Sequence, residues 1–130
     1  MCIPFFGREV KRRPVFFGRK KFTVEVADSF IKRSIGLSGR DSIGANEGML
    51  FVFVKSGRYG FWMHGMKFSI DILWLDSNMR VIYIRSNAKP CRSVFGCRTM
   101  KPDCDSKYVM ELHAGTVKKL GIHKGDKFSI

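Results

Sequence analysis

The chain of 130 residues is 45% hydrophobic and 27% charged, which is typical of one folded domain and excludes a disordered chain. Its longest uncharged apolar run, residues 48–54, is far shorter than the roughly 18 residues of a membrane-spanning helix. The N-terminal residues also lack the apolar stretch and small-residue cleavage site of a secretory signal. We therefore expect a soluble, cytoplasmic protein without a membrane span.

The charge is strongly basic and unevenly distributed. The 24 Lys and Arg residues exceed the 11 Asp and Glu residues to give +13, and residues 1–21 hold seven of the basic residues against one acidic residue. We expect residues 1–21 to form a basic, aromatic N-terminal arm and residues 22–130 to form a single domain. Such an arm is typical of nucleic-acid contact, although the same charge also serves solubility. The candidate nucleic-acid contacts are Arg8, Lys11, Arg12, Arg13, Arg19, Lys20 and Lys21.

A strand followed by a short helix is predicted at the start of the domain. Residues 22–27 alternate apolar and polar side chains, as a half-buried strand does. Asp28 or Ser29 can cap a helix that runs to about Ile35. Gly36 then ends this helix.

The rest of the chain predicts further short strands and little helix. Residues 49–54 are continuously apolar, which predicts a strand buried on both faces. The other predicted elements are a turn at 56–60, hairpin strands at 71–75 and 80–84, strands at 108–112 and 127–130, and a helix at 114–120 ended by Gly121. These elements predict a mainly β (α+β) fold, with a compact, antiparallel, partly closed, barrel-like sheet and one or two short helices.

The four cysteines do not have the spacing of a zinc site. Cys91, Cys97 and Cys104 are separated by five and six residues, and a tight pair of cysteines two to four residues apart is missing from the sequence. We therefore expect no metal. Because the stretch has the glycine and prolines of a loop, a disulfide between two of these three is the alternative to free thiols. Cys2 lies far from them in the sequence.

Six motifs in fixed order resemble the family known as domain of unknown function 192, over about residues 22–130. The motifs are R-x-x-G-L-x-x-R at 33–40, G-M-L-F-x-F at 48–53, F-W-M at 61–63, I-D-I-L at 70–73, V-M-E-L-x-A-G at 109–115 and G-I-x-x-G-D at 121–126. The resemblance implies a mainly β domain with a short helix near its start, and it implies no particular reaction. Many members read Met-Lys-Asn-Thr where this chain reads Met63-His64-Gly65-Met66, so no role of that lysine or asparagine carries over.

Two acidic residues interrupt apolar strands. Asp71 and Glu111 lie among apolar neighbours, where an unpaired carboxylate would be costly to bury. Arg33 lies on the predicted first helix, and a guanidinium can satisfy two carboxylates. We therefore expect Arg33 to contact Asp71, Glu111 or both, either as a purely structural ion pair or as the lining of a cleft.

A candidate functional cleft combines these charges with nearby side chains. Its residues are Arg33, Trp62, His64, Asp71 and Glu111. The favoured function is a binding or accessory module for an unknown ligand or protein. The alternatives are a nucleic-acid-binding protein and a small hydrolase in which His64 is the base, Asp71 orients it and Glu111 assists. No glycine-rich phosphate loop, nucleophile elbow or metal motif is present in the sequence, so we expect no cofactor.

Overall fold

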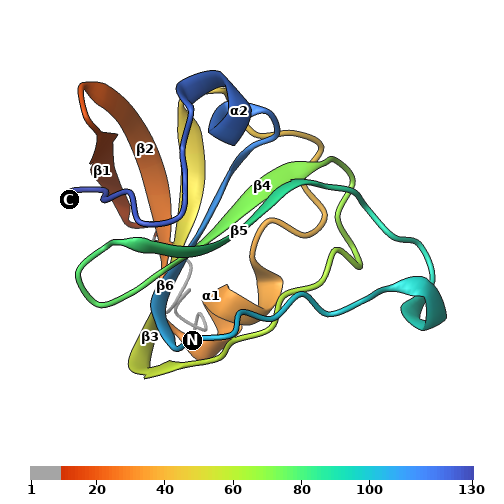
Figure 1. Cartoon of the computed structure of the whole chain (residues 1–130). Coiled ribbons are helices and arrows are strands. Elements are labelled where there is room, and N and C mark those ends of the chain that lie inside the picture. The colour runs from red at the N-terminus through yellow and green to blue at the C-terminus, as the bar shows by residue number, and fades with distance from the viewer. Residues whose placement is uncertain (1–9) are drawn as a thin grey trace, which may run out of the picture.

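In the computed structural model, which describes residues 10–130, one curved six-stranded sheet carries a short α-helix on each face (Figure 1). The elements in chain order are β1 (Arg12–Phe17), β2 (Lys20–Ala27), α1 (Phe30–Ile35), β3 (Glu47–Gly57), β4 (Ile70–Leu75), β5 (Val81–Ala88), the 3-10 helix η1 (Val94–Gly96), β6 (Ser106–His113) and α2 (Thr116–Leu120). Among the described residues, no helix is long and apolar enough to cross a membrane.

The strands lie in the order β1-β2-β3-β6-β4-β5, so the last strand in the sequence is inserted between β3 and β4. Neighbouring strands pair antiparallel except β2 and β3, which are parallel because the chain crosses over through α1 between them. The C-terminal segment forms isolated bridges to Phe16 through Ser129 and to Arg80 through Lys127. It therefore links the two edges of the sheet without closing it as a strand.

The predicted mainly β fold with two short α-helices is confirmed. Three details differ from the expectation. The sheet is mixed rather than purely antiparallel, since a helical crossover forces one parallel pair. The predicted strand at 127–130 is present only as bridges. The strand predicted at 49–54 is buried as far as Phe51, but Val54 is exposed because β2 pairs with β3 only up to that point.

The structure also places part of the expected N-terminal arm inside the domain. Arg12–Phe17 forms an edge strand that pairs with β2, and Val15 is fully buried beside Phe22 in the core. Basic residues and Pro14 hide the alternation of this strand in the sequence, yet both are tolerated at a sheet edge. The rest of the arm, residues 1–9 with Cys2 and Arg8, lies outside the described residues.

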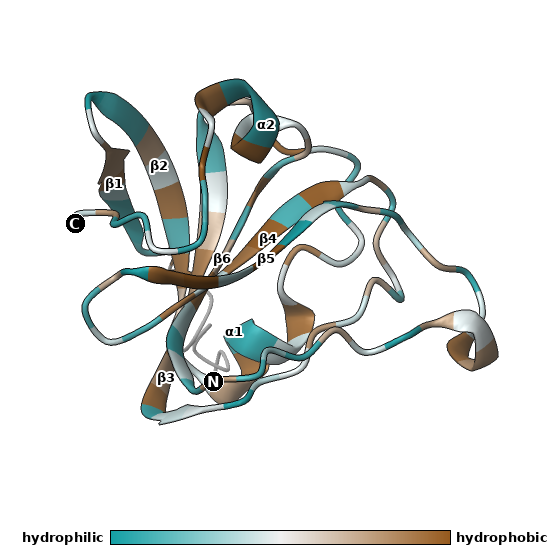
Figure 2. Cartoon of the chain, in the orientation of Figure 1, coloured by the Kyte–Doolittle hydropathy of each residue, from teal (hydrophilic) through white to brown (hydrophobic). Residues whose placement is uncertain are grey.

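Each face of the sheet has its own hydrophobic core, because successive strand residues point to opposite faces. On β3, Leu50 belongs to the core that α2 and the C-terminal segment cover, whereas Met49 and Phe51 belong to the core on the α1 side. Figure 2 shows hydrophobic residues along the strands and hydrophilic residues at the β1–β2 turn.

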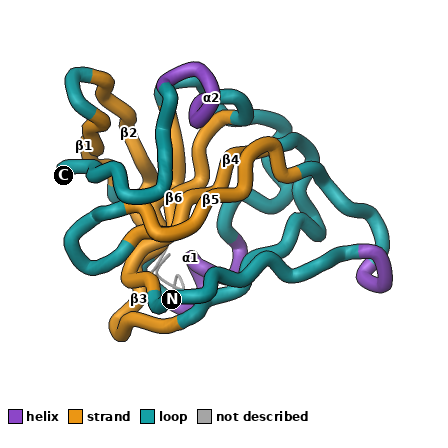
Figure 3. Tube along the Cα trace, in the orientation of Figure 1, coloured by secondary structure: helices purple, strands orange, loops and turns teal. Residues whose placement is uncertain are grey.

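The short helix α1 is fixed at both ends as the sequence predicts. The Ser29 side chain caps it by accepting a hydrogen bond from the backbone N–H of Lys32 at 3.2 Å. Gly36 ends it with a φ of 51°, a conformation that favours glycine. Because the helix is short, long loops complete the cover of this face, as Figure 3 shows for the connections on either side of η1.

Candidate functional site

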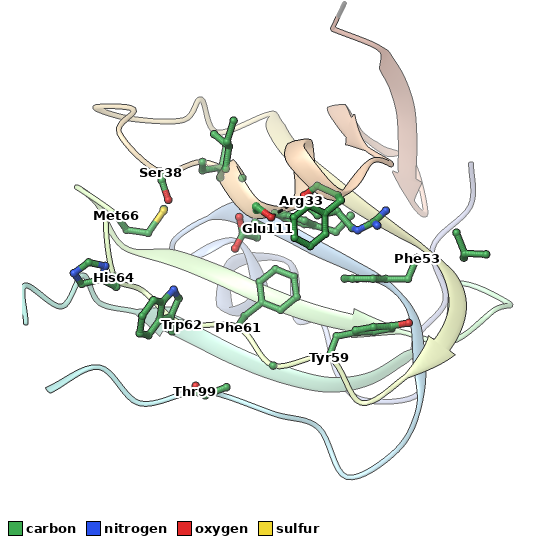
Figure 4. A pocket seen from close by; sticks show the side chains of 18 of the residues that line it. Arg33, Ser38, Phe53, Tyr59, Phe61, Trp62, His64, Met66, Thr99 and Glu111 are labelled. Carbon is green, nitrogen blue, oxygen red and sulfur yellow. Dashed lines mark hydrogen bonds between the residues drawn. The ribbon is translucent and has the colours of Figure 1, made fainter. Parts of the chain in front are cut away.

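A pocket of about 870 Å³ lies between α1 and the sheet. Its walls come from α1, the outer half of β3 and the segment 59–66, and Thr99 and Glu111 complete it (Figure 4). A volume in this range is typical of sites for small organic molecules.

Among the residues that the structure describes, Glu111 is the only acidic one that lines the pocket. It lies on the central strand β6, opposite Met49 of β3 and Ile72 of β4, and its side chain therefore shares the α1-side face with theirs. The residue is 5% exposed, and no hydrogen bond or ion pair joins its carboxyl group to another residue within 10–130. Desolvation by burial raises the pKa of Glu111 from its ordinary 4.5 to about 8.

The predicted ion pair between Arg33 and the two carboxylates is wrong. The Arg33 Nη1 donates instead to the backbone carbonyl of Val52 at 2.9 Å, and the guanidinium lies 5.2 Å from the ring centroid of Phe53. The β2–β3 pairing ends at Phe51, and the Val52 carbonyl just beyond it accepts from this side chain. Arg33 still lines the pocket, as predicted, but as part of its wall.

Asp71 lies on the opposite face of the sheet, which corrects the predicted cleft. Ile72, its neighbour on β4, is the residue in register with Glu111, so Asp71 points the other way. Its two carboxylate oxygens accept hydrogen bonds from the backbone N–H groups of Asn87 and Val117, both at 2.8 Å. Asp71 therefore holds α2 and the end of β5 in place and does not line the pocket.

Trp62 and His64 both line the pocket, as expected from the sequence. The Trp62 side chain is 46% exposed, and its ring centroid lies 5.1 Å from that of His64. The predicted pairing of His64 with Asp71 as base and orienter is not formed, because both Asp71 oxygens bond elsewhere on the other face. The three residues of the hydrolase alternative are thus not assembled.

An aromatic wall was missed by sequence reasoning. Phe53 and Tyr59 stack with ring centroids 3.6 Å apart, and Phe61 packs edge-to-face with Phe51 at 4.9 Å. All four residues line the pocket. The spacing of Phe51 and Phe53 by two residues was the available signal, since it puts both on one face of a strand.

The basic residues at the start of the chain are partly engaged within the domain. Of the six predicted nucleic-acid contacts within the described residues, three have partners: Lys11 with Asp28 and Arg12 with Glu25 as ion pairs at 3.5 Å, and Lys20 with Asn46 as a hydrogen bond. Arg13, Arg19 and Lys21 are exposed on β1, the turn and β2. Arg8 lies outside the described residues.

The cysteine-rich loop is closed by a disulfide between Cys91 and Cys97, which is one of the pairings left open by the sequence. Cys104 is a free, exposed thiol. The loop also supports the pocket, since Met100 forms a backbone β-bridge with Phe61 and Cys91 forms one with His64. No group of three or more His, Cys, Asp or Glu side chains that could hold a metal ion occurs within the described part of the chain.

Replacing both Cys91 and Cys97 with serine is expected to lower the free energy of unfolding by about 2 kcal/mol, because the bond closes a short loop. Urea unfolding of the double variant measures this loss, and Cys104→Ser is the matched control with an unchanged value. Alkylation without reduction, followed by peptide mapping, should label Cys104 and leave Cys91 and Cys97 unlabelled. Equal labelling of all three would contradict the pairing.

Comparison with known proteins identifies relatives over most of the chain. The chain is 32% identical over 108 residues to a UPF0127 protein of Thermococcus gammatolerans, covering 82% of this chain and 65% of that relative. It is 33% identical over 106 residues to a UPF0127 protein of Pyrococcus abyssi, covering 80% of this chain and 82% of the relative. The chain thus spans about two thirds of the length of the Thermococcus protein.

Two solved structures share the fold. One, from Sinorhizobium meliloti and described as a "putative transcription regulator", has a TM-score of 0.83 and 31% identity over 92% of this chain and 94% of that chain. Another, from Novosphingobium aromaticivorans and described as a protein of unknown function, has a TM-score of 0.81 and 27% identity over 92% of this chain and 85% of that chain.

The family model named DUF192, described as an uncharacterized ACR, matches residues 15–130. This match begins within β1, seven residues before the start expected from the motifs. The resemblance predicted from the six motifs is therefore confirmed, and the chain belongs to the DUF192 family.

Proposed function

We propose that the protein is a binding module whose pocket takes a small organic ligand with an apolar body and one polar group directed at Glu111. The observation that supports this proposal is the Glu111 side chain, which is 5% exposed, forms no hydrogen bond or ion pair within residues 10–130 and lines an aromatic pocket. A largely desolvated carboxyl group of this kind gains free energy when a ligand group forms a hydrogen bond with it. We also propose that the protein is cytoplasmic.

The surroundings of Glu111 support small-ligand binding. Aromatic side chains form much of the wall, and Trp62 at 46% exposure offers a partly uncovered ring. Apolar walls with a few converging polar groups are typical of small-molecule sites. Of the predicted cleft, Arg33, Trp62, His64 and Glu111 gather around this one cavity.

Nucleic-acid binding through the basic N-terminal residues is less well supported. Half of the candidate contacts within the described residues already have partners in the domain, including both residues at the start of the β1 edge, Lys11 and Arg12. Deleting residues 1–20 would also remove β1 with buried Val15, so lost affinity would not separate binding from folding. We therefore favour ligand binding in the pocket over nucleic-acid binding.

A fragment screen by NMR that follows both the signals of the fragments and the indole N–H signals of the protein tests the proposal. Apolar fragments with one polar group are expected to bind and to shift the indole N–H resonance of Trp62. Trp62→Ala should weaken this binding about fivefold, because an aromatic contact contributes about 1 kcal/mol. Phe95→Ala is the matched control, since Phe95 is fully exposed and lies outside the pocket. An absence of fragment binding, or equal losses in the two variants, would overturn the proposal.

A further inference from the structure

We propose that the ligand is an organic cation, an ammonium or amidinium group on an aromatic or aliphatic body, whose charge lies between the Glu111 carboxylate and the aromatic rings of the pocket. This inference rests on the proposed function and names the chemical class of its ligand. Figure 4 shows the juxtaposition that carries it: the Glu111 carboxyl group faces the same cavity as the rings of Phe61 and Trp62.

Residues 10–130 supply no counter-ion to Glu111. In the described part of the chain, three basic residues line the pocket, and none forms an ion pair with Glu111. Arg33 is held by the Val52 carbonyl, His64 packs on Trp62, and Lys55 lies on the exposed outer part of β3. A carboxylate beside a chain cation would have a lowered pKa, whereas burial raises the pKa of Glu111 to about 8. The position beside Glu111 is thus open to a cation from outside.

The aromatic wall suits the same class of ligand. A cation within about 6 Å of a ring centroid is attracted by the electrons of the ring face. The wall already holds one such contact, because the Arg33 guanidinium lies 5.2 Å from the centroid of Phe53. The rings of Phe61 and Trp62 line the part of the pocket that this guanidinium does not occupy (Figure 4).

The net charge of +13 repels an approaching cation, but this repulsion comes mainly from charged side chains on the protein surface. At 0.15 M salt, exposed charges are screened beyond about 8 Å. A carboxylate contact made inside the pocket is screened much less. We therefore expect Glu111 to set the preference for a cationic over a neutral ligand. The binding measurements should be made at 0.15 M salt.

Binding of a cation requires Glu111 to release its proton. The affinity of a ligand that stays cationic follows the ionised fraction of Glu111, so it rises about 50-fold between pH 6 and pH 8. Within residues 10–130, the other titratable or charged groups that line the pocket are Arg33, Lys55, Tyr59 and His64. His64 packs against Trp62 and forms no ion pair with Glu111. His64→Gln should therefore retain most of the rise.

Titration with 2-phenylethylamine and its neutral isostere 2-phenylethanol tests the class of ligand. At pH 8 the amine should bind at least about tenfold more tightly than the alcohol, since a charge pair in a desolvated site adds more than a neutral hydrogen bond. Glu111→Gln should abolish this preference and the rise with pH. Phe95→Ala, at an exposed residue outside the pocket, should leave both unchanged.

The outcomes separate this inference from the proposed function. Equal or tighter binding of 2-phenylethanol, or of 3-phenylpropionate, would overturn the cationic class while leaving the pocket as a ligand site. A preference for the amine that survives in Glu111→Gln would also overturn it, because the charge would then be recognised elsewhere. If the fragment screen gives no binding either, the proposed function fails with it.

Discussion

Asp71→Ala is expected to lower the free energy of unfolding by about 3 kcal/mol, because it removes the acceptor of two backbone N–H groups, one buried and one part-buried. One belongs to Asn87, where the β4–β5 pairing shifts register between Ile70–Ala88 and Ile72–Arg85. The other belongs to Val117 in the first turn of α2. The N-cap residue of this helix is Gly115, which has no side chain to cap it. One carboxylate thus stabilises both a strand irregularity and a helix start.

Urea unfolding measures this loss. Asp71→Asn retains one acceptor oxygen and should lose about half as much stability. Asp103→Ala removes an exposed carboxylate in the loop that precedes β6 and should change the free energy of unfolding by less than about 0.5 kcal/mol. A loss in Asp71→Ala no larger than in Asp103→Ala would show that these two hydrogen bonds do not support the fold.

Burial could be predicted from the sequence for both interrupting acids, but the face that each occupies could not. Asp71 and Glu111 are both buried, as their apolar neighbours suggested. Their separation onto opposite faces depends on the register that pairs Ile72 with Glu111, and a shift of one residue would exchange the faces. Register is set by contacts between strands that are far apart in the sequence, so it cannot be predicted from the local pattern of apolar and polar residues.

The same limit explains what was predicted well and what was missed elsewhere. The helix from Ser29 to Gly36 depends on neighbours in the sequence, and its two ends were predicted correctly. The partner of Arg33 depends on where β2 stops pairing with β3, which is a tertiary fact, and the predicted ion pair was wrong. The edge strand β1 was missed because two of its three exposed positions are basic and the third, Pro14, directly precedes the buried Val15.

The stability of the protein is expected to fall by about 5 kcal/mol as the pH rises from 4.5 to 8, through Glu111 alone. Burial raises the pKa of Glu111 from 4.5 to about 8, so the folded state holds this proton more tightly than the unfolded state does. Between these two pH values the folded state binds more protons, and stability is lost with rising pH at up to about 1.4 kcal/mol per unit. Below pH 4.5 and above pH 8 the contribution is constant.

Glu111→Gln isolates this effect, since the amide has nearly the shape of the protonated acid and does not ionise. The difference in free energy of unfolding between this variant and the natural chain should be small at pH 4.5 and grow to about 5 kcal/mol in favour of the variant at pH 9. Glu47→Gln, at an exposed carboxyl group outside the pocket, is the matched control. Parallel pH profiles for Glu111→Gln and the natural chain would mean that Glu111 ionises in the folded protein as it does in water. The aromatic pocket would then not desolvate the Glu111 carboxyl group. A cationic ligand would in that case meet a carboxylate that water already solvates, and the basis for the cationic class of ligand would be lost.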